Sequence, residues 1–411
     1  MQGTGNNQLF FPKSLQFFLI FYEYFCNLRQ QFNYGGVVLK KIFNLEYEKN
    51  RAKYFPNISD DKWNDWHWHV DNRITDADSL KHFFPNVDVE PIKNVAEHFS
   101  FSVTPYFLSL INNNELLSDP LGKQVIPDIR ELHIDSRLVL DPFKEKNEHS
   151  PIPGIVRRYP DRIILVTTNF CPAKCRYCTR KWNWSKCQIL THDMLENVVA
   201  YLKKHSEIRE VILTGGEPFL LDLDFLDYIL SAVSSVESVE VIRIGTRILS
   251  FLPQRITDDV VSVLSKYSPV WIVTHFNHPN EFTSETEKAV KKILYAGCAL
   301  CNQSVLLKDV NNSADVMKQL VHALQNILIK PYYIFHPDLI EGTSHFRGCI
   351  DEGIQIMKKL RGYTGGICVP YYVVDLPDGG KIPLLPDYVL KKDEKGILFS
   401  NYEENEFFYN G

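Results

Sequence analysis

The chain has 411 residues, 45% of them hydrophobic and 13% aromatic, which is enough apolar material for one large or two modest domains. Its formal net charge of −5 excludes the broad basic surface that attracts nucleic acids or anionic membranes. The nine cysteines are odd in number and three are clustered, so we expect reduced, metal-binding thiols in the cytoplasm rather than a disulfide framework.

We interpret residues 1–56 as an N-terminal appendage. Its apolar stretch, residues 17–22, lies between Lys13 and Glu23 and is far shorter than the ~20 apolar residues that span a bilayer. It also lacks the small-residue cleavage site of a signal peptide. An over-long translation start and a weak amphipathic surface helix are both open interpretations of this segment.

Residues 57–150 predict a helical domain with polar loops, because apolar residues recur there at helical spacing. The helical stretches are 79–84, 91–98, 105–111 and 126–132. The tryptophans between positions 63 and 68 are interpreted as packing residues. Residues 141–161 are rich in proline and charge, which is typical of a linker to the next domain.

From residue 162, strand-like and helical stretches alternate, which favours an α/β fold with a parallel sheet. The strand-like runs are Arg162–Thr168, Glu210–Leu213, Val239–Ile244, Val270–His275, Leu300–Leu307 and Tyr332–His336. The helical stretches that follow them are 193–204, 224–235, 258–266, 284–295, 314–328 and 347–361. These units predict a partial (β/α)6 TIM-like barrel over residues 151–361, with the active site on the loops after the strands. Residues 362–411 predict a C-terminal β-rich segment.

Three cysteines, Cys171, Cys175 and Cys178, follow the first strand-like run in a CxxxCxxC spacing. A cubane iron–sulfur cluster usually takes four cysteine ligands, so three leave one iron open to a small molecule. This spacing is typical of radical S-adenosylmethionine (SAM) proteins, in which SAM chelates the open iron. A zinc loop is the alternative, with Cys187 or His192 as the fourth ligand.

The second strand-like run ends in Gly215-Gly216-Glu217-Pro218. Two glycines let the backbone approach a ligand closely. After a cysteine motif of this kind, we expect the ligand to be the amino group of SAM, bound by backbone carbonyls or by Glu217.

A basic segment and a C-terminal lysine indicate a phosphate-bearing cofactor. Arg158, Tyr159 and Arg162 stand at the start of the barrel, and a planar guanidinium can bond two phosphate oxygens at once. Lys381 follows a glycine-rich turn after Asp375. A reactive lysine with a basic clamp fits pyridoxal 5′-phosphate (PLP), held as a Schiff base. An exposed turn lysine and a solvated arginine-rich linker are the alternatives.

Residues from about 60 to 400 resemble the lysine 2,3-aminomutase family of radical SAM enzymes. The matching strings, in order, are Trp63–Trp66, Arg158–Arg162, Cys171–Arg180, Leu252–Thr257, Thr274–Glu281, Asn302–Leu307 and Asp375–Lys381. The resemblance implies a radical SAM type of partial barrel, with an N-terminal helical region and a C-terminal segment that carries the PLP lysine. It also implies three cofactors: a 4Fe–4S cluster, SAM and PLP.

The resemblance implies a role for each matching residue. The cluster ligands would be Cys171, Cys175 and Cys178, and Lys381 would be the catalytic lysine that forms the Schiff base. PLP would be contacted by Arg158, Tyr159 and Arg162, and SAM by Gly215, Gly216, Glu217, His275 and Gln303. The substrate would be bound by Arg180 at its α-carboxylate and by Asp338 and Asp375 at its side-chain ammonium.

The implied activity moves the α-amino group of L-lysine to the β-carbon and yields β-lysine, through a 5′-deoxyadenosyl radical derived from SAM. Two carboxylates at one site favour a basic amino acid over glutamate, because an acidic group would add to their mutual repulsion. The alternatives are the same chemistry on arginine, glutamate or a specialised amino acid, and a non-catalytic iron–sulfur or zinc-binding relative. The expected partners are the amino-acid substrate, an electron donor such as flavodoxin or ferredoxin, and further copies of the chain, but no nucleic acid or membrane.

The sequence departs from the family pattern in several places. The turn that ends at Lys381 is one glycine shorter than usual, which can change the reach of the lysine. His336-Pro337 stands where Gln-Cys is commoner, which can reshape the substrate pocket. Ser313 stands where some members have a zinc-ligating cysteine, and the cysteine-rich tail is absent. We therefore expect no structural zinc and a weaker or different dimer contact.

Overall fold

The computed structural model describes residues 43–112, 116–184 and 188–410. Most of the expected appendage lies outside the described residues. Cys187, considered above as a zinc ligand, also lies outside them.

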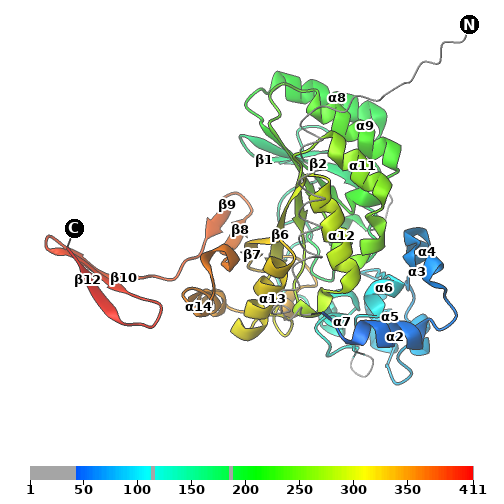
Figure 1. The fold of residues 1–411 in the computed structure, drawn as a ribbon, viewed down its shortest axis with the longest axis horizontal. Coiled ribbons are helices and arrows are strands. Elements are labelled where there is room, and N and C mark those ends of the chain that lie inside the picture. The colour runs from blue at the N-terminus through cyan, green and yellow to red at the C-terminus, as the bar shows by residue number, and fades with distance from the viewer. Residues whose placement is uncertain (1–42, 113–115, 185–187, 411) are drawn as a thin grey trace, which may run out of the picture. The chain divides into compact units, whose positions relative to one another are not determined.

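Within the described residues, nine strands form one sheet and follow one another in chain order (Figure 1). They are β1 (Ile155–Tyr159), β2 (Arg162–Thr168), β3 (Glu210–Gly215), β4 (Val241–Gly245), β5 (Trp271–Thr274), β6 (Ala299–Val305), β7 (Lys330–Phe335), β8 (Tyr371–Leu376) and β9 (Gly380–Pro383). Strands β2 to β8 run parallel, whereas β1 and β9 are antiparallel edges. No backbone ladder joins the described edge strands β1 and β9, so the barrel is open along one side.

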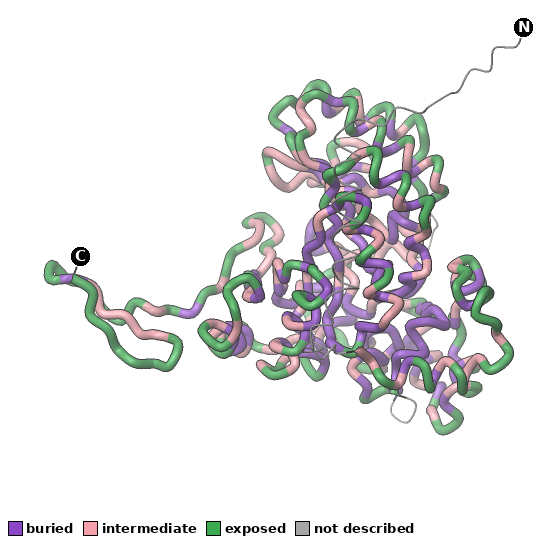
Figure 2. The backbone as a smooth tube through the Cα atoms, in the orientation of Figure 1, coloured by how far each residue is buried: buried purple, intermediate pink, exposed green. Residues whose placement is uncertain are grey.

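Long helices follow the strands and cover the outside of the sheet: α8 (His192–Lys204), α9 (Leu223–Ser234), α11 (Asp258–Lys266), α12 (Ser284–Tyr295), α13 (Ala314–Asn326) and α14 (Ile350–Leu360). Most begin at a side chain that caps the first turn, namely Thr191, Asp222, Thr257, Thr283 and Ser313. Their apolar faces pack on the strands, where Figure 2 shows much of the buried backbone. The predicted β/α units are confirmed, with boundaries shifted by a few residues. None of the helices in the described ranges is long and apolar enough to cross a membrane.

The N-terminal region consists of short helices: α2 (Glu46–Tyr54), α3 (Asp60–Asn64), α4 (Trp66–Asp71), α5 (Glu90–Ala96), α6 (Pro105–Leu108) and α7 (Gly122–Val125). Another short helix, α10 (Ile248–Phe251), follows β4, and 3-10 turns lie at Asp78–His82, Ile129–Leu132, Lys181–Asn183, Pro218–Leu220, Pro253–Arg255, Pro279–Glu281, Ser344–Phe346 and Gly366–Cys368. Trp63 and Trp68 are buried in the core of this region, as the packing interpretation expected.

Helix α2 lies inside the range interpreted as an appendage, yet it is packed into the helical region. Asn50 is buried and donates from Nδ2 to the carbonyl oxygens of Ser109 at 3.1 Å and Ile111 at 2.8 Å. The hydroxyl of Tyr47 accepts a hydrogen bond from the indole N–H of Trp63 at 2.9 Å. The helical region therefore begins earlier than residue 57. The sequence pattern missed this because α2 is mostly polar and is held by hydrogen bonds instead of an apolar stripe.

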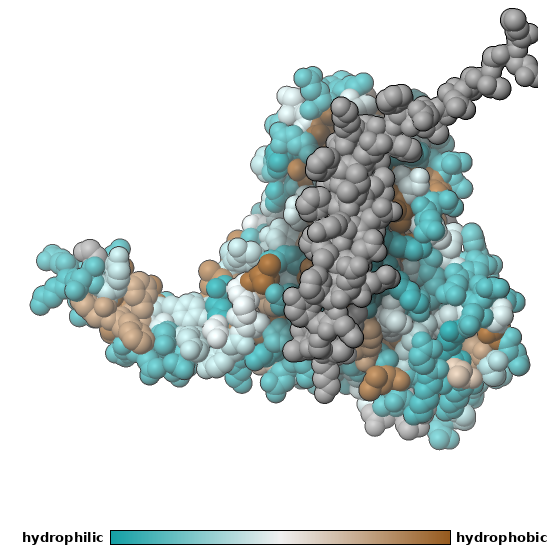
Figure 3. Space-filling model, viewed as in Figure 1, coloured by the Kyte–Doolittle hydropathy of each residue, from teal (hydrophilic) through white to brown (hydrophobic). Residues whose placement is uncertain are grey.

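The barrel sheet extends beyond both boundaries that the sequence predicted for it, the linker before residue 162 and the end of the barrel at residue 361. Strand β1 lies within the expected linker 141–161, where its charged residues hide the strand pattern, and β8 and β9 lie in the C-terminal segment but continue the barrel sheet. The remaining strands, β10 (Val389–Asp393), β11 (Gly396–Ser400) and β12 (Glu406–Tyr409), form a separate antiparallel sheet. Figure 3 shows apolar side chains on this sheet, and the exposed ones include Leu390, Phe407 and Phe408.

Candidate active site

A cavity of about 660 Å³ lies inside the barrel. Its wall contains every residue that the family resemblance assigns to a cofactor or to the substrate: Arg158, Tyr159, Arg162, Cys171, Cys175, Cys178, Arg180, Gly215, Gly216, Glu217, His275, Gln303, Asp338, Asp375 and Lys381. The lysine and the three cysteines therefore open onto one shared space. The wall also contains Glu145, Tyr177 and Arg247, which the sequence analysis did not select.

The cysteine loop follows β2 directly, and its three thiols are half-buried. Burial raises the pKa of the Cys178 thiol to about 11, and the neighbouring Cys175 adds to the shift. Burial also raises the pKa of Cys171, with Cys178 as the second cause. Such thiols ionise when a metal cation binds them, because the cation stabilises the thiolate form.

The cysteine triplet fits a cubane cluster. In the described parts of the chain, no three His, Cys, Asp or Glu side chains converge as they would on one metal ion. A cubane cluster offers each thiolate a separate iron, so its ligands need not meet at one point.

Buried ion pairs hold the cysteine loop to the N-terminal region. Arg176 donates from Nε and Nη2 to the Glu131 carboxylate, each at 2.8 Å, and Lys181 donates to it at 2.7 Å. All three side chains are almost completely buried. No sequence motif marked Glu131, because it lies 45 positions before Arg176.

The two glycines at the end of β3 are required by the close approach of the cysteine loop. A Cβ atom at Gly215 would lie 2.2 Å from the carbonyl oxygen of Thr168, and one at Gly216 would lie 2.2 Å from that of Phe170. The backbone N–H of Glu217 donates to the Phe170 oxygen at 2.8 Å. The close approach seen in the structure is to the backbone before the first cysteine, and the approach to a ligand that the sequence analysis expected stays a prediction.

The Glu217 carboxylate is buried and already engaged. It accepts hydrogen bonds from the backbone N–H of Phe219 at 3.2 Å and Arg247 at 2.9 Å, and from the Thr246 hydroxyl at 2.7 Å. Burial raises its pKa to about 7. Both carboxylate oxygens therefore join the turn after β3 to the loop after β4.

Tyr177, inside the cysteine loop, lies in a polar network that the sequence analysis missed. Its hydroxyl lies 2.9 Å from Nε2 of His275 and accepts a hydrogen bond from Arg247. Arg247 also donates to the Cys175 sulfur at 2.9 Å. Burial, followed by the charge of Arg247, lowers the pKa of His275 well below its ordinary value, so its ring is neutral. Gln303 lines the same cavity from β6.

Side chains of β1 close the open side of the barrel. Arg158 donates to Asp375 Oδ1 at 3.0 Å and to the carbonyl oxygen of Leu376 at 2.7 Å. The Tyr159 hydroxyl accepts a hydrogen bond from the backbone N–H of Lys381 at 3.0 Å. The Lys381 amine lies 3.4 Å from Asp375 Oδ2. We call these contacts between β1 and the β8–β9 hairpin the seam.

Arg162 and Arg180 lie in different parts of the cavity wall. Arg162 stacks on the ring of Tyr159, 3.8 Å from its centroid, and donates to Asp161 at 2.8 Å. Arg180 donates from Nε and Nη2 to Glu145, at 2.6 Å and 2.8 Å. Arg162 therefore lies beside the seam residue Tyr159, whereas Arg180 lies directly after the cysteine motif.

Asp338 follows β7 and lines the cavity. Burial raises the pKa of its carboxyl to about 7, and the negative charge of Asp375 is the second cause. Asp375 forms ion pairs with Arg158 and Lys381, but among the described residues none forms an ion pair with Asp338. This wall of the cavity therefore presents a carboxyl group that can receive a cation.

The structure shows where two of the departures from the family pattern lie, the His336-Pro337 pair and the shortened turn before Lys381. His336 is buried with Nδ1 at 2.8 Å from the Tyr372 hydroxyl, and Pro337, not His336, lines the cavity. The shortened turn connects β8 to β9, and Lys381 still reaches the cavity wall. The shorter turn is therefore compatible with a lysine at this site.

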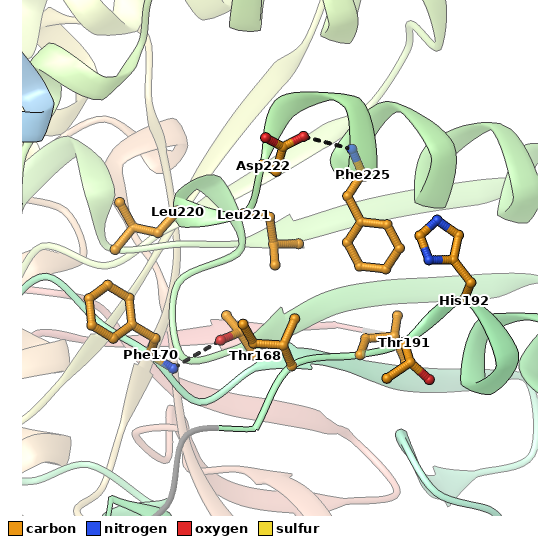
Figure 4. A pocket seen from close by; sticks show the side chains of 10 residues that line it. Thr168, Phe170, Thr191, His192, Leu220, Leu221, Asp222 and Phe225 are labelled. Atoms are coloured by element: carbon orange, nitrogen blue, oxygen red, sulfur yellow. Dashed lines mark hydrogen bonds between the residues drawn. The ribbon is translucent and has the colours of Figure 1, made fainter.

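A second cavity, of about 460 Å³, is lined by residues around the end of β2 and the starts of α8 and α9 (Figure 4). His192, considered above as a zinc ligand, lies there with its ring 4.8 Å from that of Phe225 and 5.1 Å from that of Tyr228. The three cysteines of the motif line the larger cavity and not this one. His192 is therefore an exposed residue beside two aromatic rings, and it does not line the cavity of the thiols.

The fold and the three-cysteine site define a radical SAM protein, and residues 165–306 match the family model described as the Radical SAM superfamily. Residues 357–409 match a second model, described as Lysine-2,3-aminomutase. The L-lysine 2,3-aminomutase of Fusobacterium nucleatum is 41% identical over 86% of this chain and 84% of that protein. That of Methanococcus maripaludis is 42% identical over 87% of this chain and 83% of that protein. The glutamate 2,3-aminomutase of Clostridioides difficile is 39% identical over 92% of this chain and 89% of that protein.

The chain belongs to the lysine 2,3-aminomutase family. It is a radical SAM aminomutase and therefore an isomerase. The cofactors of this family are a 4Fe–4S cluster, SAM and PLP, and the cysteine triplet fits the cluster.

Proposed function

We propose that the chain converts L-lysine to β-lysine by moving the α-amino group to the β-carbon. The observation that supports this choice is the Asp338 carboxyl, which lines the cavity beside Asp375 without a cationic partner of its own among the described residues. The side-chain ammonium of lysine would neutralise it, whereas the carboxylate of glutamate would add a further negative charge.

We assign the cavity residues to the family's cofactors as follows. Cys171, Cys175 and Cys178 hold the cluster, Gly215, Gly216, Glu217, His275 and Gln303 line the SAM site, and Arg158, Tyr159, Arg162 and Lys381 hold PLP. When bound, PLP supplies a conjugated electron sink, and the cluster with SAM supplies hydrogen-atom abstraction. The donor sets fit these groups, because the thiols suit iron and the arginines suit a phosphate.

The chain's own task is to hold the substrate at both ends. Arg180 binds the α-carboxylate, while Asp338 and Asp375 bind the side-chain ammonium. Fixing both ends positions the α- and β-carbons for an intramolecular transfer.

An anaerobic product assay tests the proposal. The reconstituted enzyme is supplied with SAM, a reductant and L-lysine, L-arginine or L-glutamate in separate reactions. We expect β-lysine as the main product. A β-amino acid formed from glutamate or arginine, with none from lysine, would contradict the substrate assignment and leave the reaction class intact.

Three further expectations stay predictions. They are a cytoplasmic location, an electron donor such as flavodoxin or ferredoxin, and assembly with further copies of the chain. The exposed apolar side chains on the sheet formed by β10, β11 and β12 are the surface that supports such an assembly.

A further inference from the structure

Glu145 has no role in the assignments above, yet it lines the cavity and forms a close ion pair there. Its carboxylate accepts a hydrogen bond from Nε of Arg180 at 2.6 Å and another from Nη2 at 2.8 Å. The Glu145 side chain is only 9% exposed, and the Arg180 side chain is 15% exposed. Two parallel hydrogen bonds of this kind fix the plane of a guanidinium, unlike a single contact.

We propose that Glu145 is a positioning residue, which holds the Arg180 guanidinium in the orientation that receives the α-carboxylate of the substrate. This inference rests on the role proposed above for Arg180. It adds a residue that acts through the arginine without touching the reacting atoms.

The geometry of the guanidinium allows both interactions at once. Arginine carries five N–H donors in a rigid fork, and Glu145 occupies the edge formed by Nε and Nη2. The edge formed by Nη1 and Nη2 keeps donors for a second carboxylate. Nη1 makes a longer contact, 3.4 Å, with the carbonyl oxygen of Gly215. A substrate carboxylate can therefore bind Arg180 without displacing Glu145.

Glu145 is itself held in place by its neighbours in the chain. Its backbone N–H donates to Asp141 at 3.0 Å. Lys144 donates to Asp378 at 3.2 Å, in the turn that precedes Lys381. Phe143 lies under the guanidinium of Arg158, 4.4 Å from the ring centroid. The segment is thus anchored at the seam on one side and at Arg180 on the other.

The orientation of Arg180 matters for affinity because an arginine side chain has many rotamers in water. An arginine that is already ordered loses less conformational entropy when the substrate binds. Without Glu145, the guanidinium would also lose the carboxylate with which it forms an ion pair. The substrate carboxylate would then meet a mobile group instead of a fixed one.

The test is the dissociation constant of the amino-acid substrate, measured from the absorbance of the PLP-loaded enzyme in the absence of SAM so that no turnover occurs. Glu145→Gln is expected to weaken binding about tenfold, the scale of one lost charge-assisted interaction. With SAM and reductant added, KM should rise by a similar factor while kcat stays within about twofold. Glu145→Asp, which keeps the charge, should recover part of the affinity.

Matched variants separate positioning from a general structural role. Glu148→Gln makes the same chemical change at an exposed residue of the same segment and should leave the affinity unchanged. In an Arg180→Gln background, Glu145→Gln should have no further effect, because its influence passes through the arginine. The iron and PLP contents report whether each variant is folded. If Glu145→Gln does not fold, Glu145→Asp takes its place in the binding measurement.

Each opposite result would overturn the inference. Unchanged affinity in Glu145→Gln would show that Glu145 does not act on the substrate. Tighter binding would show that it competes with the substrate carboxylate, and an undiminished effect in the Arg180→Gln background would show a role elsewhere. The wild-type measurement tests the proposed function separately. The comparison uses whichever of lysine, arginine and glutamate the wild type binds, since all carry an α-carboxylate.

Discussion

The hydroxyl of Tyr159 accepts a hydrogen bond from the backbone N–H of Lys381 at 3.0 Å, although the two residues are 222 positions apart. Tyr159 ends β1 and Lys381 lies in β9, so the bond joins the two edges of the barrel sheet. With the ion pair between Arg158 and Asp375, it closes the barrel through side chains instead of a backbone ladder. The residues proposed to bind PLP therefore lie where the barrel closes.

Lys381→Ala should abolish the absorbance band of lysine-bound PLP and the formation of any β-amino acid. The reason is that its amine is the amine proposed to bond the PLP aldehyde at the seam. Lys391→Ala, at an exposed position in β10, is the control and should retain the band. Visible spectra of the anaerobically reconstituted proteins provide the measurement, and a retained band in Lys381→Ala would refute the assignment of this lysine.

Gly216→Ala should impair assembly of the iron–sulfur cluster. The added Cβ would lie 2.2 Å from the carbonyl oxygen of Phe170, so the backbone before Cys171 must shift. Gly365→Ala is a matched control, because a Cβ there meets nothing within 4 Å. Iron bound per chain after reconstitution measures the effect, and equal iron contents in the two variants would contradict it.

The barrel could be predicted from the sequence because each unit carries its own signal, a strand-like run followed by a helical stretch. The cysteine loop and Lys381 were also local motifs. The seam and the Glu131 cluster were not predictable in this way, because they join residues far apart in the chain that share no pattern. Glu217 shows a further limit of prediction from sequence motifs. Its carboxylate accepts hydrogen bonds from Thr246 and Arg247 of the protein, and the motif alone does not reveal these contacts.

Glu131→Gln should destabilise the protein strongly. The substitution removes the carboxylate that Arg176 and Lys181 share and leaves two buried cations without a full counter-charge. Breaking a buried pair in this way costs about 3–5 kcal/mol. Glu240→Gln removes an exposed pair with Arg209 and should cost less than about 1 kcal/mol. Urea unfolding of the two variants measures the difference, and similar midpoints would show that the cluster around Glu131 does not stabilise the protein.

The affinity for L-lysine should rise as the pH increases from about 6 to about 8, because Asp338 attracts the substrate ammonium only when ionised. Burial, and then the charge of Asp375, raises the pKa of this carboxyl to about 7, so its ionisation falls inside that range. Lys381, Arg158 and Arg347 also face it and oppose the shift. The effect on stability has the opposite sign, because the folded state holds the proton more tightly than the unfolded chain and loses stability as the pH rises toward 7.

Titration of L-lysine into the PLP-loaded enzyme across this range measures the affinity. Asp338→Asn should bind more weakly and lose the inflection near 7, and an unchanged inflection in that variant would assign the pH dependence to another group.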